Sequence, residues 1–568
     1  MRPTEEDPRV STLNIGPGKA KGFEILQPAT TLSGSPIEPV HRGLPKITQS
    51  LCPECLRIIE ARLFEEAGRV IMEKTCPQHG YLRDTVFSDV KLYLKMDEWS
   101  FGDNQGVSNP AIPSATRCPD QCGLCSMHTS HSGMGVVDLT NRCNLTCPVC
   151  FANSNAAGYL YEPSFEQVRR MLKALRDEKP VNTRIVQFSG GEPTIHPRFL
   201  DCVRLAKEMG FSHVQVATNG ITFTDVEFAQ AAKEAGLHTL YLQFDGVCDD
   251  IYRRTRGEPL LDLKLQCIEA VRKAGMKICF VPTVVKGLND DQIGNMIRLA
   301  IDNIDCVSAV SFQPVSFCGR ISKAELESKR YTLSDFAHDF EKQTGIAKAY
   351  EDWFPLSCVS PFSKLLSALR GEATTHLTSH PHCSMGTYLF VDQKKNAVPA
   401  TQFIDIGGML REMDLLARKA GKQSIKLFTK IKAWNALRKH YHEDRAPQGL
   451  SFEKFLQTLQ GMMDKRYGRG QAEAEGFTYK TLMVAGMHFM DAYNFDVERV
   501  KRCVVHYAAP NGLLYPFCTY NSGPCYREKI ERKYSIAFEQ QPEFLALLEA
   551  NGNGSGRRTR QPELAELV

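Results

Sequence analysis

The chain has 568 residues, of which 42% are hydrophobic and 24% are charged, and its formal net charge is +4. This length and composition are typical of a globular protein of about three to four structural units, and they exclude a small disulfide-stapled, fibrous or disordered protein. The nearly balanced charge gives no reason to expect nucleic acid as a partner.

The N-terminal sequence MRPTEEDPRV lacks a basic segment followed by an apolar one, and no later window holds about 18 consecutive apolar residues. We therefore expect a cytoplasmic protein with neither a signal peptide nor a membrane-spanning helix. In a reducing compartment, closely spaced cysteines indicate metal or redox sites rather than disulfides. Nine of the 20 cysteines lie between Cys52 and Cys150, which predicts metal chemistry in that part of the chain.

Changes in composition divide the chain into five parts. We expect an irregular lead-in, a Cys-rich metal-binding region, a β/α barrel, a C-terminal region with further metal ligands, and a C-terminal helix or disordered tail. A mainly helical insertion is expected within the fourth part, at about residues 418–500. The five parts span residues 1–50, 51–133, 134–320, 321–535 and 536–568.

Two short cysteine motifs flank a predicted β-hairpin near the N-terminus. CPEC contains Cys52 and Cys55, and CPQHG contains Cys76 and His79. Donors at this spacing on both ends of a hairpin are typical of a mononuclear metal site, with His79 as a candidate fourth ligand. An iron site of four cysteines would need one more thiol, so iron and zinc both stay open at this point.

A cysteine triplet with intervals of three and two residues follows, formed by Cys118, Cys122 and Cys125. The same spacing returns in Cys143, Cys147 and Cys150. Thiolates at such short intervals favour iron–sulfur clusters. We therefore expect a cluster at each triplet.

From residue 135 onward, strand and helix patterns alternate along the chain. Each predicted strand is followed by an amphipathic stretch such as FEQVRRMLKALRDE, which is the pattern of β/α units around a parallel sheet. We predict an α/β fold, namely a partial (β/α)6 barrel with Cys-rich N-terminal and C-terminal extensions. The predicted strands are residues 135–140, 184–189, 213–218, 239–245, 277–285 and 307–314.

The second triplet, Cys143, Cys147 and Cys150, follows the first predicted barrel strand directly. Active sites of such folds lie at the C-terminal ends of the strands. Three cysteines bind three corners of a cubane cluster and leave one iron open to an outside ligand. A zinc site would need a fourth protein donor, and none follows within the loop.

Glycine and polar residues follow the other predicted strands and suit a ligand cradle. Asn219, Gln243 and Gln313 are candidates for ligand contact, although amides at a barrel mouth also cap loops. Asp245 follows the fourth strand, and we expect an internal ion pair with Arg253 or Arg254.

Five more cysteines lie outside the barrel in loop-like contexts, and we expect them to be auxiliary metal ligands. They are Cys358, Cys383, Cys503, Cys518 and Cys525. Between Arg418 and Arg445 the chain has nine Lys and Arg residues against two acidic ones. Such a segment suits either a solvated basic helix or an interfacial helix at an anionic membrane surface.

The triplet Cys143, Cys147 and Cys150, combined with the GGEP stretch after the second strand, resembles the radical S-adenosylmethionine (SAM) superfamily. The resemblance implies a radical SAM barrel whose catalytic [4Fe–4S] cluster is held by these cysteines, with SAM on the open iron. The residues expected to bind SAM are Ser189, Gly190, Gly191, Glu192, Asn219, Gln243 and Gln313.

Longer runs such as DLTNRCNLTCPVCFA, FSGGEPTIHP and VVHYAAPNGLLYPFCTYN resemble the archaeal tetraether-lipid synthase group and its bacterial relatives, some labelled pterin-methylating. One enzyme of that group carries three [4Fe–4S] clusters and a rubredoxin-like iron. The resemblance therefore implies SAM, one radical SAM cluster, two auxiliary clusters, a mononuclear iron or zinc, and an electron donor of the ferredoxin or flavodoxin type.

One departure from that group concerns the first triplet, which ends at Cys125. Where relatives have a further cysteine, this chain reads HTSHSG between His128 and Gly133. An open iron, a histidine such as His131, or a distant cysteine could complete that site. We expect the spare thiol of the C-terminal cysteines to do so.

Three hypotheses for function follow. The first is hydrogen abstraction from an unactivated carbon, leading to C–C bond formation between lipid chains, with a peripheral membrane contact. The second is methylation or alkylation of a pterin-like small molecule. The third is a non-catalytic electron-transfer or zinc-ribbon protein, which would need neither the GGEP stretch nor a three-cysteine cluster.

Overall fold

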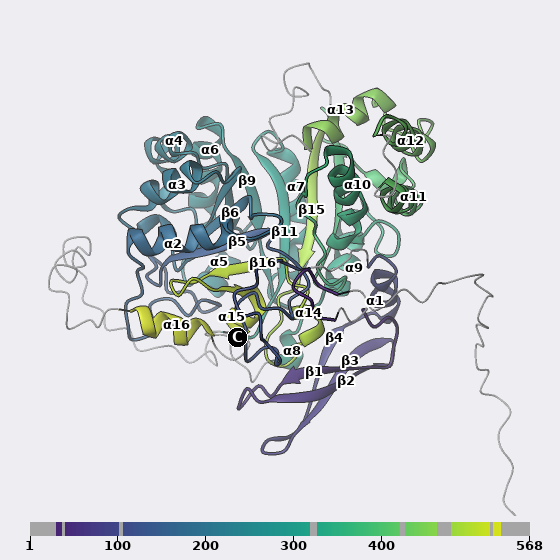
Figure 1. The fold of residues 1–568 in the computed structure, drawn as a ribbon. Coiled ribbons are helices and arrows are strands. Elements are labelled where there is room, and N and C mark those ends of the chain that lie inside the picture. The colour runs from purple at the N-terminus through teal and green to yellow at the C-terminus, as the bar shows by residue number, and fades with distance from the viewer. Residues whose placement is uncertain are drawn as a thin grey trace, which may run out of the picture.

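The computed structural model describes residues 30–36, 40–100, 106–318, 326–420, 426–462, 479–522 and 526–535. A curved, mainly parallel sheet forms the centre of the molecule, and a small antiparallel sheet lies at its lower end in the view of Figure 1. Within these ranges, no helix has the length and the apolar character that crossing a bilayer requires. The tail expected over residues 536–568 lies outside the described residues.

The six barrel strands expected from the sequence are confirmed, and neighbouring strands pair in parallel. The fifth expected strand is divided in two because Pro282, which has no N–H for a ladder hydrogen bond, lies between its halves. The strands are β5 (Met134–Thr140), β6 (Ile185–Gly190), β7 (His213–Thr218), β8 (Thr239–Gln243), β9 (Lys277–Val281), β10 (Thr283–Val284) and β11 (Val307–Pro314).

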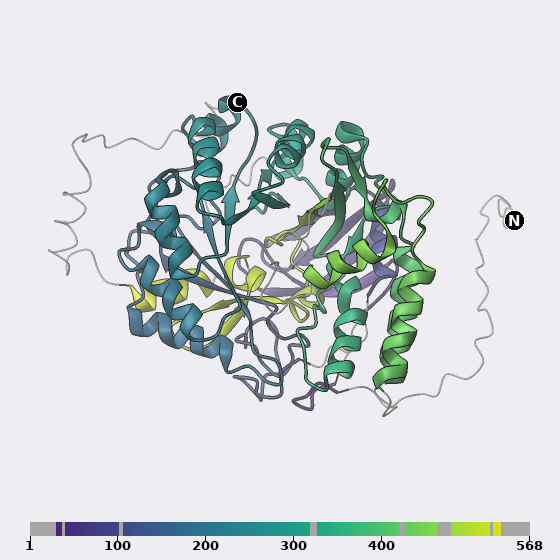
Figure 2. The same cartoon turned by 90° about the horizontal axis from the view of Figure 1, so that it is seen from above.

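Amphipathic helices cover the outer side of these strands, as the blue and teal ribbons of Figure 2 show. In the first helix, Ser164 and Gln167 form a capping box, and Val168, Leu172 and Leu175 are buried against the sheet. Burial of each such side chain stabilises the fold by about 1.5–3 kcal/mol. The helices are α2 (Phe165–Arg176), α3 (Phe199–Glu208), α4 (Val226–Ala235), α5 (Asp249–Arg256), α6 (Leu261–Lys273) and α7 (Ile293–Asp302).

The sheet continues beyond the barrel on both sides. On one side β15 (Lys480–Met487) pairs in parallel with β11, and β13 (Ser384–Val391) pairs antiparallel with β15. On the other side β16 (Val505–Ala508) pairs in parallel with β5. Short strands complete the sheet: β12 (Phe354–Pro355), β14 (Ala397–Pro399) and β17 (Leu514–Pro516).

The prediction of a mainly helical region over residues 418–500 is wrong for β15. This segment alternates, with Leu482 and Val484 buried on one face and Met483 and Met487 facing a cavity on the other. A period of two is the strand pattern, and pairing with β11 buries the backbone.

Four helices pack on the extended side of the sheet, at the upper right of Figure 1. Their shared core includes Phe403, Tyr441, Phe452 and Phe455. They are α10 (Ser360–Arg370), α11 (Ile406–Ala420), α12 (Lys426–Lys439) and α13 (Phe452–Met462). The remaining helices are α1 (Val90–Asp97), α8 (Leu326–Lys329), α9 (Leu333–Thr344), α14 (Val497–Val500), α15 (Phe517–Ser522) and α16 (Tyr526–Tyr534).

The N-terminal sheet contains the predicted hairpin, with a tight turn at Ala67 and Gly68, both at positive φ. Arg330 fixes this sheet to the rest of the molecule, because its buried guanidinium lies 3.2 Å from Asp84 of the sheet and 2.7 Å from Asp491. The strands are β1 (Lys46–Leu51), β2 (Ile58–Glu66), β3 (Arg69–Cys76) and β4 (Gly80–Phe87). Strand β1 begins inside the segment that was expected to be irregular.

Candidate functional site

The loop after β5 carries Cys143, Cys147 and Cys150, and all three line one cavity of about 1750 Å³. Asn155 fixes the shape of this loop. Its side chain accepts a hydrogen bond from the N–H of Cys143 at 2.9 Å and donates to the carbonyls of Cys143 and Leu145 at 2.8 and 3.2 Å. The three thiols therefore face one space.

The GGE stretch ends β6 beside the start of the cysteine loop. The N–H of Gly191 donates to the carbonyl of Thr140 at 2.8 Å, and the N–H of Glu192 donates to that of Arg142 at 2.8 Å. A Cβ on Gly191 would lie 2.0 Å from the carbonyl oxygen of Arg142, and one on Gly190 would lie 2.1 Å from that of Thr140. Only glycine permits this approach.

The Glu192 carboxylate is buried and fully engaged by the protein. It accepts hydrogen bonds from Thr194 Oγ1 at 2.6 Å, Thr218 Oγ1 at 2.8 Å and the N–H of Asn219 at 2.8 Å. Burial raises the pKa of Glu192, and these hydrogen bonds oppose the rise. Glu192 thus ties the end of β6 to the end of β7.

The structure places every residue expected to bind SAM along the same cavity, and their contact with SAM stays a prediction. Asn219 donates to Asn144 Oδ1 at 2.7 Å, next to Cys143, and Gln243 accepts from Lys264 Nζ at 2.7 Å. The residues in question are Ser189, Gly190, Gly191, Glu192, Asn219, Gln243 and Gln313.

The barrel side of the cavity carries a row of amides and hydroxyls. Gln215 donates to Gln187 at 2.6 Å, Gln313 donates to the Tyr241 hydroxyl at 3.0 Å, and Tyr241 donates to Ser311 at 3.1 Å. These side chains come from the inner face of neighbouring strands, and all of them line the cavity. These amides and hydroxyls therefore offer hydrogen-bond donors and acceptors that carry no charge.

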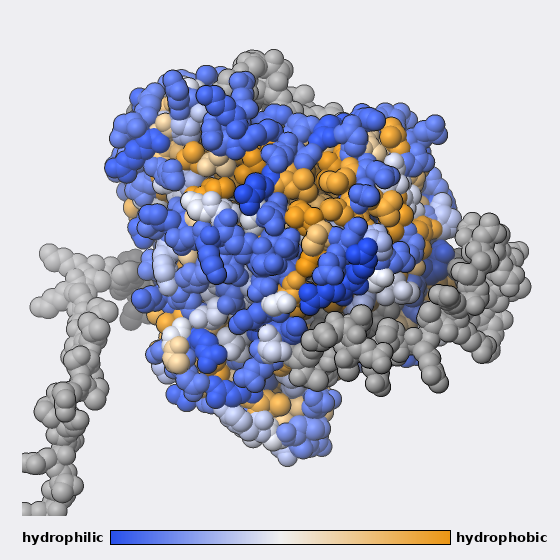
Figure 3. Space-filling view, turned by 180° about the vertical axis from the view of Figure 1, so that it is seen from behind, coloured by the Kyte–Doolittle hydropathy of each residue, from blue (hydrophilic) through white to orange (hydrophobic). Residues whose placement is uncertain are grey.

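The opposite side of the cavity is apolar and is built by β13, α10, α11 and α13. Figure 3 shows that hydrophobic side chains also gather at the surface, in a broad area over the upper half of the face turned away in Figure 1. A contiguous apolar area of this kind marks an interaction site in soluble proteins. The apolar lining includes Leu365, Leu369, Phe390, Met409, Met413 and Phe455.

The chemistry of the loop thiols fits an iron–sulfur cluster. Burial, and then the charge of Glu192, raise the pKa of Cys143 to about 12, and burial also raises that of Cys147. A metal that binds such thiols displaces their protons. Among the described residues, the donors close enough to share one ion form a different site, and a cluster of several irons at the loop triplet stays a prediction.

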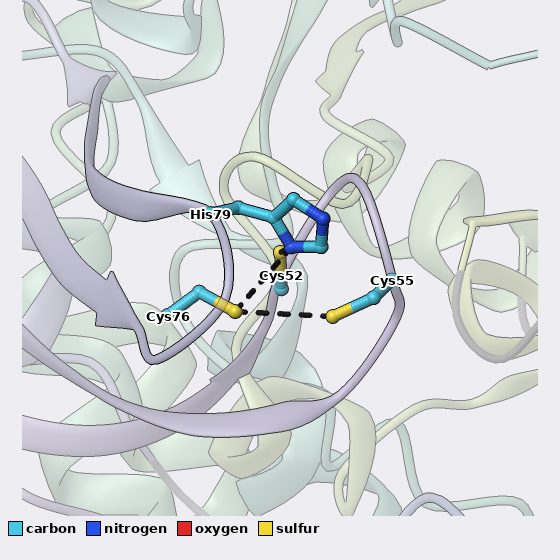
Figure 4. A group of neighbouring side chains, drawn as sticks. All are labelled: Cys52, Cys55, Cys76 and His79. Carbon is cyan, nitrogen blue, oxygen red and sulfur yellow. Dashed lines mark hydrogen bonds between the residues drawn. The ribbon is translucent and has the colours of Figure 1, made fainter.

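That different site is formed by Cys52, Cys55, Cys76 and His79, whose ligand atoms all lie within 4.8 Å of one another. Figure 4 shows the four side chains converging from two turns. The sulfurs of Cys55 and Cys76 are 3.8 Å apart, and His79 Nδ1 lies 3.5 Å from Cys52 and from Cys76. Tetrahedral bonds of about 2.3 Å separate two sulfurs by roughly 3.8 Å, so the geometry fits a mononuclear ion.

Backbone hydrogen bonds prepare this site for a metal. The N–H of Gln78, more than any other group, lowers the pKa of Cys76 to about 6, and hydrogen bonds from His79 assist. Burial raises the pKa of Cys52. Cys76 is therefore a thiolate at neutral pH, ready to bind a cation.

We expect Cys52→Ser combined with Cys55→Ser to release one metal atom per chain without loss of sulfide, because a mononuclear site has no bridging sulfur. Iron, zinc and acid-labile sulfide are measured on the variant and on the unaltered protein. Exposed Cys248→Ser serves as the matched control. Loss of sulfide together with metal would show that this site holds a cluster.

The first triplet, Cys118, Cys122 and Cys125, is buried in the segment between α1 and β5. Burial raises the pKa of each thiol. The charge of Cys125 adds to the rise at Cys118, and the charges of Cys118 and Cys125 add to the rise at Cys122, so the three lie close together. The Nε2 of His131 is already engaged, because it accepts a hydrogen bond from the N–H of His376 at 3.1 Å. A cluster at this triplet stays a prediction.

Of the five C-terminal cysteines, the structure brings Cys383, Cys503 and Cys518 together. Burial raises the pKa of Cys503 and of Cys518; the charge of Cys383 adds to both rises, and that of Cys503 adds to the rise at Cys518. Cys358 instead lines the main cavity, and only burial raises its pKa. Cys525 lies outside the described residues. A metal site at the first three thiols stays a prediction.

An aromatic stack joins the loop of the second triplet to this group. Phe151, which follows Cys150, stacks on Phe517, which precedes Cys518, with ring centroids 5.5 Å apart. Phe489 also stacks on Phe517, with ring centroids 3.8 Å apart.

The ion pair expected between Asp245 and Arg253 or Arg254 is wrong. Asp245 pairs with Arg256 at 2.6 Å, while Arg253 is exposed. Arg256 ends α5 on the buried side of the helix, whereas residue 253 lies on the solvent side. No local sequence signal separates the three arginines.

Part of the basic segment is neutralised locally. Four of its cations pair with acidic side chains of the same helical region, and the fourth of these pairs joins Arg445 to Asp444. Ile431 and Trp434 of α12 are about half exposed, at 48% and 50%. Lys422 lies outside the described residues. The other three pairs are Arg418 with Asp414, Arg438 with Glu443, and Lys439 with Glu412.

Two family models match the chain. The radical SAM superfamily model matches residues 137–300, and the HMPTM N-terminal zinc ribbon domain matches residues 44–88. The chain is 42% identical to 7,8-dihydro-6-hydroxymethylpterin dimethyltransferase of Methanocaldococcus jannaschii over 499 residues, which cover 87% of this chain and 96% of that relative.

More distant likenesses cover part of the chain. GTP 3′,8-cyclase of Limosilactobacillus fermentum is 26% identical over 212 residues, which cover 37% of this chain and 61% of that protein. The crystal structure of Streptococcus suis SuiB bound to precursor peptide SuiA has 15% sequence identity and a TM-score of 0.31, covering 52% of this chain and 70% of that one.

Proposed function

This chain belongs to the radical SAM superfamily, and we propose that it alkylates an unactivated carbon of a pterin-like small molecule. The main support is the relative named as a pterin dimethyltransferase, to which the chain is similar along 96% of that protein's length. The hypothesis of a non-catalytic protein is thereby set aside. The lipid hypothesis has less support from the relatives.

In this proposal Cys143, Cys147 and Cys150 hold a [4Fe–4S] cluster, and SAM binds beside the end of β6. Cluster and SAM together supply a 5′-deoxyadenosyl radical, which is chemistry that belongs to the cofactors. The protein contributes the loop that Asn155 shapes and the close approach that Gly191 permits.

The amide side chains on the barrel side of the cavity favour the hypothesis of a heterocyclic substrate. A pterin ring carries alternating hydrogen-bond donors and acceptors, and Gln187, Gln215 and Gln313 offer both kinds of group within one cavity. In the free protein Gln215 donates to Gln187, and Gln313 donates to the Tyr241 hydroxyl, so a bound ring would take over some of these hydrogen bonds.

A second candidate is C–C bond formation between lipid chains, and the apolar side of the cavity favours it. Leu365, Leu369, Phe390 and Met413 offer no partner to a polar ring, but they would bury a hydrocarbon chain. Each buried methylene group contributes about 0.8 kcal/mol to such binding.

A reciprocal pair of variants separates the two substrates. For a pterin-like substrate, Gln215→Leu should raise KM roughly ten-fold, because an unpaired buried hydrogen-bonding group costs about 1–3 kcal/mol. Leu369→Gln should then change KM less than about two-fold. The measurement is substrate-dependent formation of 5′-deoxyadenosine with a dihydropterin. A larger increase in KM for Leu369→Gln than for Gln215→Leu, together with turnover of a diether lipid, would favour the second candidate.

Three further points stay proposals. We propose a ferredoxin or flavodoxin as the one-electron donor, since the reductive cleavage of SAM needs one. We also propose a cytoplasmic location, and a membrane contact of α12 through Ile431 and Trp434 if the substrate is a lipid.

A further inference from the structure

Arg256 is the last residue of α5, and its guanidinium lies between Asp245 and the cysteine loop. Nε donates to Asp245 Oδ2 at 2.6 Å, and Nη1 donates to the carbonyl of Val149 at 2.9 Å. Burial raises the pKa of the Cys147 thiol, and the charge of the neighbouring Arg256 guanidinium opposes this rise. Val149 lies between Cys147 and Cys150, so Arg256 binds the backbone of the cysteine loop and lines the same cavity as both thiols.

Asp245 holds the guanidinium in this place. Its side chain is fully buried, and it accepts hydrogen bonds from the N–H of Thr283 at 3.0 Å, from the amide of Gln243 and from Arg256. A carboxylate with three such donors has little freedom to move. Asp245 therefore keeps the guanidinium of Arg256 in one position.

The hydrogen bonds continue from Asp245 to the GGE stretch. Gln243 accepts from Lys264 Nζ at 2.7 Å, and Lys264 donates to the carbonyl of Asn219 at 2.5 Å. The N–H of Asn219 donates to Glu192 at 2.8 Å. One buried network thus runs across the ends of three strands, from Glu192 to Arg256, which binds the carbonyl of Val149 in the cysteine loop.

We propose that Arg256 is a positioning residue, which orients the Cys147 thiolate and raises the reduction potential of the cluster that the loop holds. The proposal rests on the radical SAM assignment and on no particular substrate. It does not place Arg256 in contact with SAM or with the reacting carbon.

The direction of the effect follows from charge. Reduction adds one negative charge to a cluster, and a hydrogen bond or a positive charge at a ligand sulfur stabilises the reduced form. Arginine stays protonated at every accessible pH, and burial limits the screening of its charge by water. Asp245 offsets part of that charge, but the N–H donor to the carbonyl of Val149 remains.

The test compares Arg256→Gln, Arg256→Lys and the control Arg253→Gln, which alters an exposed arginine of the same helix. Each reconstituted holoprotein is titrated electrochemically, and EPR follows the signal that changes when SAM is added. We expect a more negative midpoint potential for Arg256→Gln, a smaller shift in the same direction for Arg256→Lys, and no shift for Arg253→Gln. Iron and sulfide contents should stay equal.

An unchanged potential in a fully loaded Arg256→Gln protein would overturn the proposal. If Arg256→Gln does not bind the cluster, the midpoint potential of Arg256→Lys tests the proposal instead. Lysine keeps the positive charge but lacks the forked donor geometry of arginine. An unshifted potential in that loaded variant would also overturn the proposal. Product formation is not measured, so failure here is distinguishable from failure of the proposed function.

Discussion

We expect the joint replacement of Cys143, Cys147 and Cys150 by Ala to abolish formation of 5′-deoxyadenosine from SAM. The three thiols face one cavity beside the GGE stretch, and their loop has no fourth cysteine. Loss of all three removes the only ligands that this loop offers to a cluster with an open iron. The assay is chromatography of anaerobic reactions with a strong chemical reductant.

Iron in the other metal sites should be retained in this triple variant. The site of Cys52, Cys55, Cys76 and His79 and the remaining cysteine groups lie in different loops. Cys248→Ala is a suitable control, since that thiol is exposed and lies at the start of α5. Normal cleavage of SAM by the triple variant would contradict the assignment of the site.

The second large effect is expected for Gly191→Ala. The added Cβ would lie 2.0 Å from the carbonyl oxygen of Arg142, so the end of β6 and the cysteine loop must separate. Forcing extra volume into a packed site costs about 1–3 kcal/mol. A displacement of about 1 Å at a catalytic site can lower the rate roughly 100-fold.

The rate of SAM cleavage under saturating reductant measures this effect, and the melting temperature reports the stability of the fold. Gly275→Ala is the matched control, because Gly275 has positive φ and a Cβ added there would meet nothing within 4 Å. It should cost about 1 kcal/mol of stability and leave the rate unchanged. A Gly191→Ala protein with full activity would show that the close approach is not required.

Local sequence patterns were sufficient to predict much of the fold. The six barrel strands and the N-terminal hairpin were predicted because alternation, turn residues and amphipathic helices are properties of short segments. Strand β15 was missed since it pairs with β11, which lies about 170 residues earlier in the chain. Its short apolar run suited a buried helix equally well.

The parts of the candidate site that depend on the spacing of residues along the chain could be predicted from the sequence. Both cysteine triplets, the GGE stretch and the two turns at Cys52 and Cys76 are visible as motifs. Arg256 could not be selected from Arg253 and Arg254, because its role depends on which side of α5 is buried. Likewise, the position of Cys358 in the cavity depends on how distant elements pack.

The most direct measurement is EPR spectroscopy of the reduced, anaerobically reconstituted protein, recorded with and without SAM. The account predicts that SAM changes the g-values of one [4Fe–4S]⁺ signal, and that SAM labelled with ¹⁷O at its carboxylate broadens it through direct coordination. The signal should be absent from the Cys143, Cys147 and Cys150 triple variant. Spectra that do not respond to SAM, or a response that persists in the triple variant, would contradict the assignment of SAM chemistry to this loop.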